Sequence, residues 1–280
     1  MGYKSILTIL TDIDDVAPVL EATLPFARSQ GAHLDVLCLG IDRTQTGYYF
    51  AGATAIIHEE TQSQSRDHAK ALEDAVRDRL GRTEITWAVE ALVAQSAMVS
   101  GLVAHRAQFS DLVMLPKPYG EGRASDAPVI VEAAMFQGSA PVMVLPGNDR
   151  LPSDKPTRAV VAWNESAEAL VAARRALPLL IAADCVEILI IDPPRHDTGA
   201  ADPGAELSKM LSRHGARVEV SVIACTMPRI SDMIERHVRD KDADLLVMGA
   251  YGHSRLREAI LGGATRNLLE QASVPVLMAR

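Results

Sequence analysis

The 280-residue sequence has few cysteines, no long apolar run and no excess of basic residues. Its three cysteines, Cys38, Cys185 and Cys225, are widely spaced and set among apolar neighbours. This pattern argues against a disulfide framework or a CxxC metal site and favours reduced thiols within the core. No stretch approaches the roughly 20 consecutive apolar residues of a membrane span, and the first ten residues do not resemble a secretory leader. We therefore expect a cytoplasmic protein without a membrane partner.

The charge balance limits the ligands that the protein can attract. Lysine and arginine number 28 against 36 aspartates and glutamates, which gives a formal charge of −8 and a pI near 5.5. A protein of this charge is not drawn broadly to nucleic acid, so we expect no nucleic-acid partner. Any phosphate ligand must be held by local groups.

The sequence repeats itself. Two runs in the first half are answered in the second, 133 and 134 residues later: 111-DLVMLP-116 by 244-DLLVMG-249, and 140-APVMVLP-146 by 274-VPVLMAR-280. A polar linker, 147-GNDRLPSDKP-156, joins the halves. The length suits two domains of roughly 100–150 residues. We therefore predict a tandem duplication with domains at 1–147 and 154–280.

Within the second half, short β-branched runs alternate with segments of helical periodicity in the order βαβαβαβαβ. The predicted strands are 158–163, 186–192, 217–224, 244–249 and 274–279. Continuous apolar strands separated by amphipathic helices predict a parallel sheet covered on both faces. Right-handed crossovers then give an α/β, doubly wound, Rossmann-like fold of five parallel strands in each half. Ligands of such folds bind at the carboxyl ends of the strands, here between the first and fourth strands.

A glycine-rich stretch, 247-VMGAYGHSRLREAILGGATRNLL-269, follows the predicted fourth strand. Gly249 and Gly252 permit close approach of the backbone to a ligand, and Gly262 and Gly263 open the last helix. The free N–H groups of that helix can hold a phosphate at Gly263, Ala264 and Thr265. The stretch has neither the Lys-Ser/Thr of a P-loop nor a GxGxxG pattern. Either glycine pair alone is also typical of ordinary turn geometry.

The spacing Gly249-x2-Gly252-x9-Gly262, with a helix and a Pro-Val-Leu strand after it, resembles the universal stress protein family. The resemblance covers both halves and implies an adenine nucleotide alpha hydrolase-like fold. It further implies that ATP, with or without Mg²⁺, is the cofactor. In the ATP-binding branch of the family the glycine pattern holds ribose and phosphates, and residues after the first two strands contact the adenosine.

The resemblance also implies the site residues. The adenosine contacts fall on Ala162, Trp163, Asn164, Ile191 and Met248, and the phosphate cradle on Gly249, Gly252, Gly262, Gly263, Ala264 and Thr265. Two positions depart from the family pattern. Asn164 stands where the family has Asp, so it offers an amide in place of a carboxylate. Gly263 stands where the family has Ser or Thr, so a hydroxyl is lost but the N–H remains.

The first half does not carry the same cradle. Pro116 stands at the position that answers Gly249, and Gly120 and Gly122 have the wrong spacing. Asp12, after the first strand, suits an adenosine-like contact, but the glycines of the cradle are missing. We therefore expect the first half to be a degenerate copy with a structural role. The two halves are expected to form an intramolecular pseudo-dimer about a pseudo-twofold axis, with homodimerisation of the whole chain left open.

These features predict a regulatory stress-response module that binds one adenine nucleotide per chain in its second half. One alternative is an ATP-hydrolysing or nucleotidyl-transferring enzyme of the same superfold. The glycine-rich loop supplies only Glu258 as a carboxylate, so we assign no catalytic residue and expect at most a weak ATPase. Another alternative is a scaffold in which neither half binds nucleotide.

Overall fold

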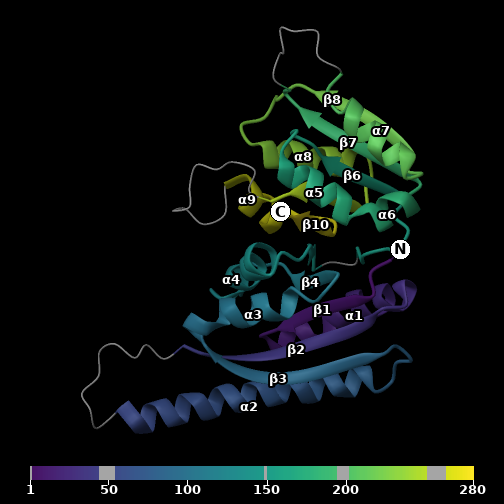
Figure 1. Ribbon diagram of the computed structural model, residues 1–280. Helices are drawn as coiled ribbons and strands as arrows, with labels where there is room; N and C mark the ends of the chain where they lie inside the picture. Colours follow the sequence, from purple (N-terminus) through teal and green to yellow (C-terminus); the bar gives the residue numbers. More distant parts are fainter. Residues whose placement is uncertain (1, 44–53, 148–149, 194–201, 251–262) are drawn as a thin grey trace. The chain divides into compact units, whose positions relative to one another are not determined.

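The computed structural model describes residues 2–43, 54–147, 150–193, 202–250 and 263–280 (Figure 1). The chain divides by its contacts into two compact units. The first, here called the N-terminal unit, consists of Tyr3–Pro116 and Ala124–Ala140. The second, here called the C-terminal unit, contains Pro141–Arg280 and the short segment Lys117–Arg123. Each unit is built on a sheet with helices packed against it.

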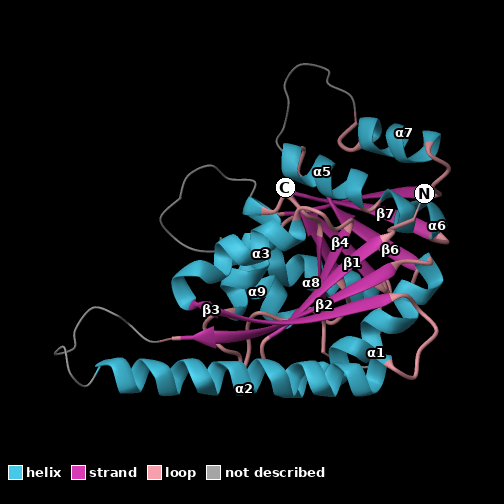
Figure 2. Cartoon of the chain, turned by 60° about the horizontal axis from the view of Figure 1, so that its bottom comes forward, coloured by secondary structure: helices cyan, strands magenta, loops and turns pink. Residues whose placement is uncertain are grey.

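The N-terminal unit has a parallel sheet in the order β3-β2-β1-β4. Its elements are β1 Ser5–Leu10, α1 Ile13–Gln30, β2 His33–Asp42, α2 Thr54–Leu80, β3 Trp87–Gln95, a 3₁₀ turn Ser96–Met98, α3 Val99–Ala107, β4 Leu112–Pro116, α4 Ala127–Glu132 and a π-helical turn Ala133–Gln137. The long helix α2 runs along β2 and β3 (Figure 2). Ala69, Leu72, Val76 and Leu80 recur on its buried face at helical spacing.

The C-terminal unit has five parallel strands in the order β10-β9-β6-β7-β8. Its elements are β5 Val142–Leu145, β6 Arg158–Ala162, α5 Ala167–Arg175, α6 Leu177–Ala182, β7 Cys185–Ile191, α7 Ala205–Arg213, β8 Val218–Ile223, α8 Ile230–Asp240, β9 Leu245–Gly249, α9 Gly263–Gln271 and β10 Val276–Ala279. The strand order reverses between β6 and β9, the first and fourth strands of the repeat. This confirms the predicted doubly wound α/β fold and its switch point.

Strand β5 adds an antiparallel neighbour to β10. Met143 pairs with Leu277, Val144 with Val276 and Val142 with Met278. Met143 and Leu277 are equivalent residues of the two repeats, since the runs 140–146 and 274–280 correspond. The ladder is therefore symmetric about the Met143–Leu277 pair. Two strands that were predicted to be exposed edges thus cover each other. By contacts β5 therefore groups with the C-terminal unit, although it is the last strand of the first repeat. The pseudo-twofold relation of the repeats as a whole stays a prediction.

Equivalent hydrogen bonds in the two repeats support the duplication. An aspartate directly before the fourth strand accepts two backbone N–H groups at the start of the first strand: Asp111 from Lys4 and Ser5, and Asp244 from Thr157 and Arg158, at 2.7 to 3.1 Å. Each carboxylate thereby fixes the relative position of two neighbouring strands. Ser5 and Arg158 thus occupy equivalent positions, as do Asp111 and Asp244.

The three cysteines are free, and their environments differ. Cys38 is buried in β2, and burial, as the largest effect, raises the pKa of its thiol to about 12. Cys185 is half-buried and Cys225 is exposed beyond the end of β8. The expectation of core thiols was therefore wrong for Cys225, because its apolar neighbours belong to a sheet edge and not to the core. Within the described ranges, no helix is both long and apolar enough to cross a bilayer.

Candidate functional site

The carboxyl ends of β6, β7 and β9 gather part of the predicted site. Ala162, the last residue of β6, pairs with Met248 in β9, and Gly249 follows directly. The N–H of Trp163 donates to the carbonyl of Leu189, which ties the chain after β6 to β7. Ile191 ends β7 on the same edge. The sheet register therefore brings these predicted residues together at the switch point.

The edge has a mixed chemical character. Ala162, Trp163 and Ile191 are half-buried, Met248 is 8% exposed, and Asn164 is exposed. Half-buried apolar side chains next to an exposed amide suit a flat, partly polar ring better than a small hydrated ion. No predicted site residue on this edge has a carboxylate side chain.

The turn after β6 is fixed by Asn164. Its side-chain oxygen accepts the N–H of Ser166 at 3.3 Å, and Glu165 between them has a positive φ of 60°. Ser166 then caps α5 by accepting the N–H of Ala169 at 3.1 Å. In the first repeat Asp12 makes the same bond, accepting the N–H of Asp14 at 3.0 Å. Both side chains thus shape the turn after the first strand; of the two predicted caps, Asn164 and Ser166, Ser166 caps α5.

Gly249 has a packing role in addition to its predicted one. A Cβ atom at this position would lie 2.4 Å from the backbone nitrogen of Ala169 and 2.7 Å from the carbonyl carbon of Glu168. Both atoms belong to the first turn of α5, so any side chain would push that helix away from β9. The glycine therefore places the start of α5 directly beside the end of β9.

The phosphate cradle is only partly described. Gly252 and Gly262 lie outside the described residues, Gly263 and Ala264 begin α9, and Thr265 is 6% exposed. Because β9 and β10 are parallel, the helix that connects them must start at the carboxyl edge of the sheet. The N-terminus of α9 therefore lies on the same edge as Gly249.

The C-terminal unit contains a buried ionic cluster that was not predicted from the sequence. Glu187, in the amino-terminal half of β7, has a fully buried side chain. Its carboxylate accepts hydrogen bonds from Ser221 at 2.5 Å and His237 at 2.9 Å, and it forms ion pairs with Lys241 at 2.9 Å and Arg158 at 3.3 Å. A glutamate within the apolar run 186-VEILIID was the signal that predicts such a cluster, since a buried charge needs partners.

The electrostatics of Glu187 follow from these partners. Burial alone raises the pKa of its carboxyl group, but hydrogen bonds from Ser221 and Lys241 and the charge of His237 outweigh burial and lower the pKa to about 2. The cluster lies away from the carboxyl edge, since Glu187 is the third residue of β7 and Ile191 the last. The cluster is therefore separate from the predicted nucleotide site.

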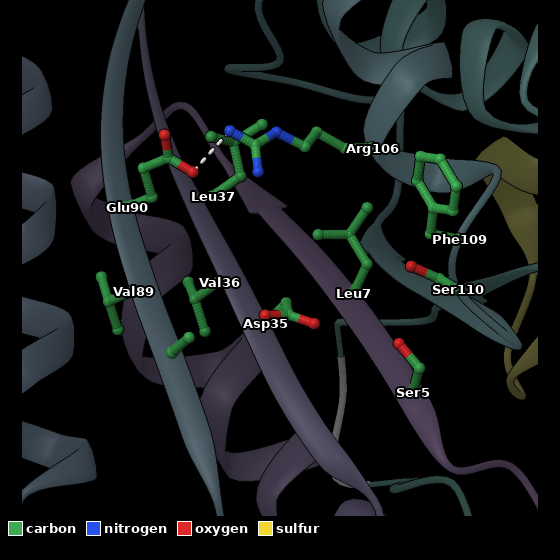
Figure 3. Close-up of a pocket in the computed structure, with 11 residues that line it drawn as sticks. Ser5, Leu7, Asp35, Val36, Leu37, Val89, Glu90, Arg106, Phe109 and Ser110 are labelled. Atoms are coloured by element: carbon green, nitrogen blue, oxygen red, sulfur yellow. Dashed lines mark ion pairs between the residues drawn. The ribbon is translucent and has the colours of Figure 1, made fainter.

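A hollow of about 460 Å³ lies in the N-terminal unit, not at the predicted site (Figure 3). It is lined from β1, β2, β3 and the end of α3 by Ser5, Leu7, Asp35, Val36, Leu37, Ala88, Val89, Glu90, Arg106, Phe109 and Ser110. Glu90 and Arg106 form an ion pair at 2.5 Å across one end of it. Sequence analysis assigned no role to this surface.

Comparison with known proteins supports the resemblance read from the sequence. Residues 156–280 match the universal stress protein family. A universal stress protein of Synechocystis sp. is 32% identical over 95 residues, which cover 34% of this chain and 32% of that relative, so the match spans about a third of its length.

Two solved structures share the fold over nearly the whole chain. One is a universal stress protein from Archaeoglobus fulgidus, with a TM-score of 0.70, 15% identity, and coverage of 99% of this chain and 96% of that one. The other is a functionally unknown protein from Pseudomonas aeruginosa, with a TM-score of 0.58, 15% identity, and coverage of 99% and 92%. At this identity the two likenesses show the fold alone. The family match therefore identifies residues 156–280 as similar to universal stress protein domains, and the two structures extend the likeness in fold to nearly the whole chain.

Proposed function

We propose that the chain is a stress-response regulatory module that binds one ATP, or a related adenine nucleotide, at the carboxyl edge of its C-terminal unit. The observation that carries this proposal is the register of β6 and β9, which places Ala162 opposite Met248 with Trp163 and Asn164 following on the same edge. The match of residues 156–280 to the universal stress protein family supports the same assignment.

The adenosine part of the ligand fits the exposed edge between β6 and β7. Trp163 and Ile191 are half-buried and offer apolar surface to a purine ring. The Asn164 side-chain oxygen already accepts the N–H of Ser166, so its amide nitrogen is the group that donates to the base or ribose. Asn164 therefore substitutes for the aspartate of the family with a donor in place of an acceptor.

The phosphates fit the N-terminus of α9. The first residues of that helix, Gly263, Ala264 and Thr265, supply backbone N–H groups, and the helix dipole favours an anion there. Thr265 is 6% exposed, so the backbone contributes more than its hydroxyl. Gly249, Gly252 and Gly262 have no side chain that could obstruct a phosphate. Magnesium that accompanies ATP is held largely by phosphate oxygens and water.

Calorimetric titration of ATP into the full-length protein tests this proposal. We expect one nucleotide per chain. Gly263→Asp, which sets a negative charge at the phosphate position, should weaken binding roughly 10- to 150-fold, the loss of one charge-assisted hydrogen bond of ~1.5–3 kcal/mol. Gly252→Val should block the approach. Pro116→Ala, at the position that answers Gly249 in the first repeat, is the matched control and should leave binding unchanged. Two equivalent sites, or binding that survives Gly263→Asp in a folded protein, would refute the assignment.

Trp163 provides an independent readout. In a Trp87→Phe background it is the remaining tryptophan of the chain, and its indole should change fluorescence when the nucleotide binds beside Asn164. An unchanged spectrum at a nucleotide concentration that calorimetry shows to be saturating would place the adenosine elsewhere.

A further inference from the structure

The hollow in the N-terminal unit and the Glu187 cluster occupy equivalent places in the two repeats. Asp35 is the third residue of β2, and Glu187 is the third residue of β7. Asp35 pairs with Leu7 and Ala88, whereas Glu187 pairs with Val160 and Glu219. Each carboxylate therefore stands at the centre of the same three-stranded part of its sheet.

In the C-terminal unit this place is filled by cationic side chains. Arg158 from β6, and His237 and Lys241 from the end of α8, surround Glu187. Lys241, whose N–H donates to the carbonyl of His237, stands three residues before Asp244, just as Gln108 stands three residues before Asp111, and this spacing makes the helix ends equivalent.

In the N-terminal unit the same positions carry small or neutral residues. The N–H of Gln108 donates to the carbonyl of Ala104 at the end of α3, so these two residues answer Lys241 and His237. Ser5 answers Arg158, since both follow the same bond to the aspartate before the fourth strand. The side chains that fill the C-terminal cluster are thus absent here, and the hollow remains.

The residues that line the hollow include one more carboxylate than cationic side chains. Among its lining residues the carboxylates are Asp35 and Glu90, and the one cation is Arg106, which pairs with Glu90. The side chain of Asp35 is 46% exposed, and His33 lies beside it at 3.5 Å. Leu7, Leu37 and Phe109 line the same hollow with apolar surface (Figure 3). A negative group beside apolar walls is complementary to a cation on a short alkyl chain.

We propose that this hollow binds a small organic cation with a guanidinium head and an alkyl stem. The head lies beside Asp35, in the place that Arg158 takes beside Glu187 in the other repeat, and the stem lies on Leu7 and Leu37. A guanidinium fits better than an ammonium because it is planar and weakly hydrated, and one Arg158 nitrogen already contacts two carboxylates in the C-terminal cluster, at 3.3 Å each. The volume of about 460 Å³ lies within the usual range of ligand sites.

Titration of the full-length, ¹⁵N-labelled protein with butylguanidinium, observed by amide NMR spectra, tests the proposal. The open site and small ligand lead us to expect a dissociation constant on the order of 1 mM. The shifts should centre on Leu7, Asp35, Leu37 and Glu90. N-butylurea has the same shape without the charge, and it should bind at least fivefold more weakly. Equal binding of the two probes, or shifts confined to the C-terminal unit, would overturn the proposal.

Two variants locate the cation. Asp35→Asn should weaken butylguanidinium binding about fivefold, whereas Glu21→Gln, which removes an exposed carboxylate elsewhere in the same unit, should not. Ser5→Arg installs the arginine of the other repeat and should abolish binding by filling the hollow. Butylguanidinium that binds normally to a folded Ser5→Arg variant would overturn the assignment. A capped Ala-Arg-Ala peptide that binds more tightly than butylguanidinium would assign the hollow to a protein partner and refute a free ligand.

Discussion

Replacing Glu187 with glutamine removes the charge at the centre of the buried cluster while keeping its shape. In the wild-type protein burial raises the pKa of this carboxyl group, but its contacts with Ser221, Lys241 and His237 outweigh burial and lower the pKa from 4.5 to about 2. A shift of this size corresponds to about 3 kcal/mol of stability at pH 7. The Glu187 side chain is fully buried, but the Lys241 side chain is 39% exposed, so solvent screens part of this energy.

The sign of the pH dependence follows from the direction of the shift. A carboxyl group whose pKa is lower in the folded than in the unfolded protein stabilises the fold fully at pH values above its unfolded-state pKa. This stabilisation is lost as the pH falls through the folded-state pKa. The free-energy difference between wild type and Glu187→Gln should therefore be about 3 kcal/mol at pH 7. It should fall to about half near pH 3.3 and nearly vanish by about pH 2. Taking the difference cancels the titration of other carboxylates common to both proteins.

Urea unfolding at a series of pH values measures this difference. Trp163 fluorescence in a Trp87→Phe background reports the C-terminal unit alone, which avoids treating a two-unit chain as a single transition. A Lys241→Met variant tests the network, since its destabilisation should shrink in the Glu187→Gln background. A difference that stays constant from pH 7 to pH 2 would show that the charge of Glu187 does not stabilise the fold.

Three further outcomes follow from the structure. Gly249→Ala should destabilise the C-terminal unit by roughly 1–3 kcal/mol because the new Cβ meets the backbone of α5. Gly101→Ala in α3 is the control, because its Cβ would meet open space, and it should be neutral or stabilising. Equal shifts of the thermal unfolding midpoint for the two variants would contradict the packing argument. Asp244→Asn should lower the free energy of unfolding in urea by about 1–2 kcal/mol, because each carboxylate oxygen accepts a backbone N–H and the amide keeps only one oxygen. An unchanged unfolding midpoint would show that Asp244 does not hold β6 and β9 together. At pH 8, exposed Cys225 should react quickly with iodoacetamide, whereas Cys38, which is buried and has a pKa of about 12, should stay unmodified in the folded protein. Rapid modification of Cys38, detected by mass spectrometry, would show that its burial is incomplete.

The sequence predicted the fold well because two independent patterns agreed. Apolar strands such as 244-DLLVMG, buried from Leu245 to Met248, have counterparts in the first half, and the structure confirms the strand order that they imply. The local roles of single residues were harder to predict. Asn164 and Gly249 were predicted to contact a ligand. In the structure Asn164 also accepts a hydrogen bond within the turn after β6, and Gly249 packs against the first turn of α5. Both roles depend on neighbours that only the folded chain brings together.

The Glu187 cluster was missed for a different reason. Its members come from β6, β7, β8 and α8, so no local pattern connects Arg158, Glu187, Ser221 and Lys241. A single charge in an apolar strand predicts that partners exist, but it does not identify them. Equivalent positions of the two repeats differ here: the same place holds buried ion pairs in one copy and an open hollow in the other.

The double role of Gly249 decides which variants can test nucleotide binding. A side chain at Gly249 displaces the start of α5, and α5 follows the Asn164 turn that belongs to the proposed adenosine site. Lost binding in a Gly249 variant therefore has two causes that a binding assay cannot separate. Gly263 begins α9, at the far end of the glycine-rich stretch, and an aspartate there adds a charge at a helix start, where acidic side chains stabilise helices. If Gly263→Asp abolishes binding while α9 and the unit stay folded, repulsion of the phosphate is the remaining explanation. That variant, and not Gly249→Ala, carries the test of the phosphate position.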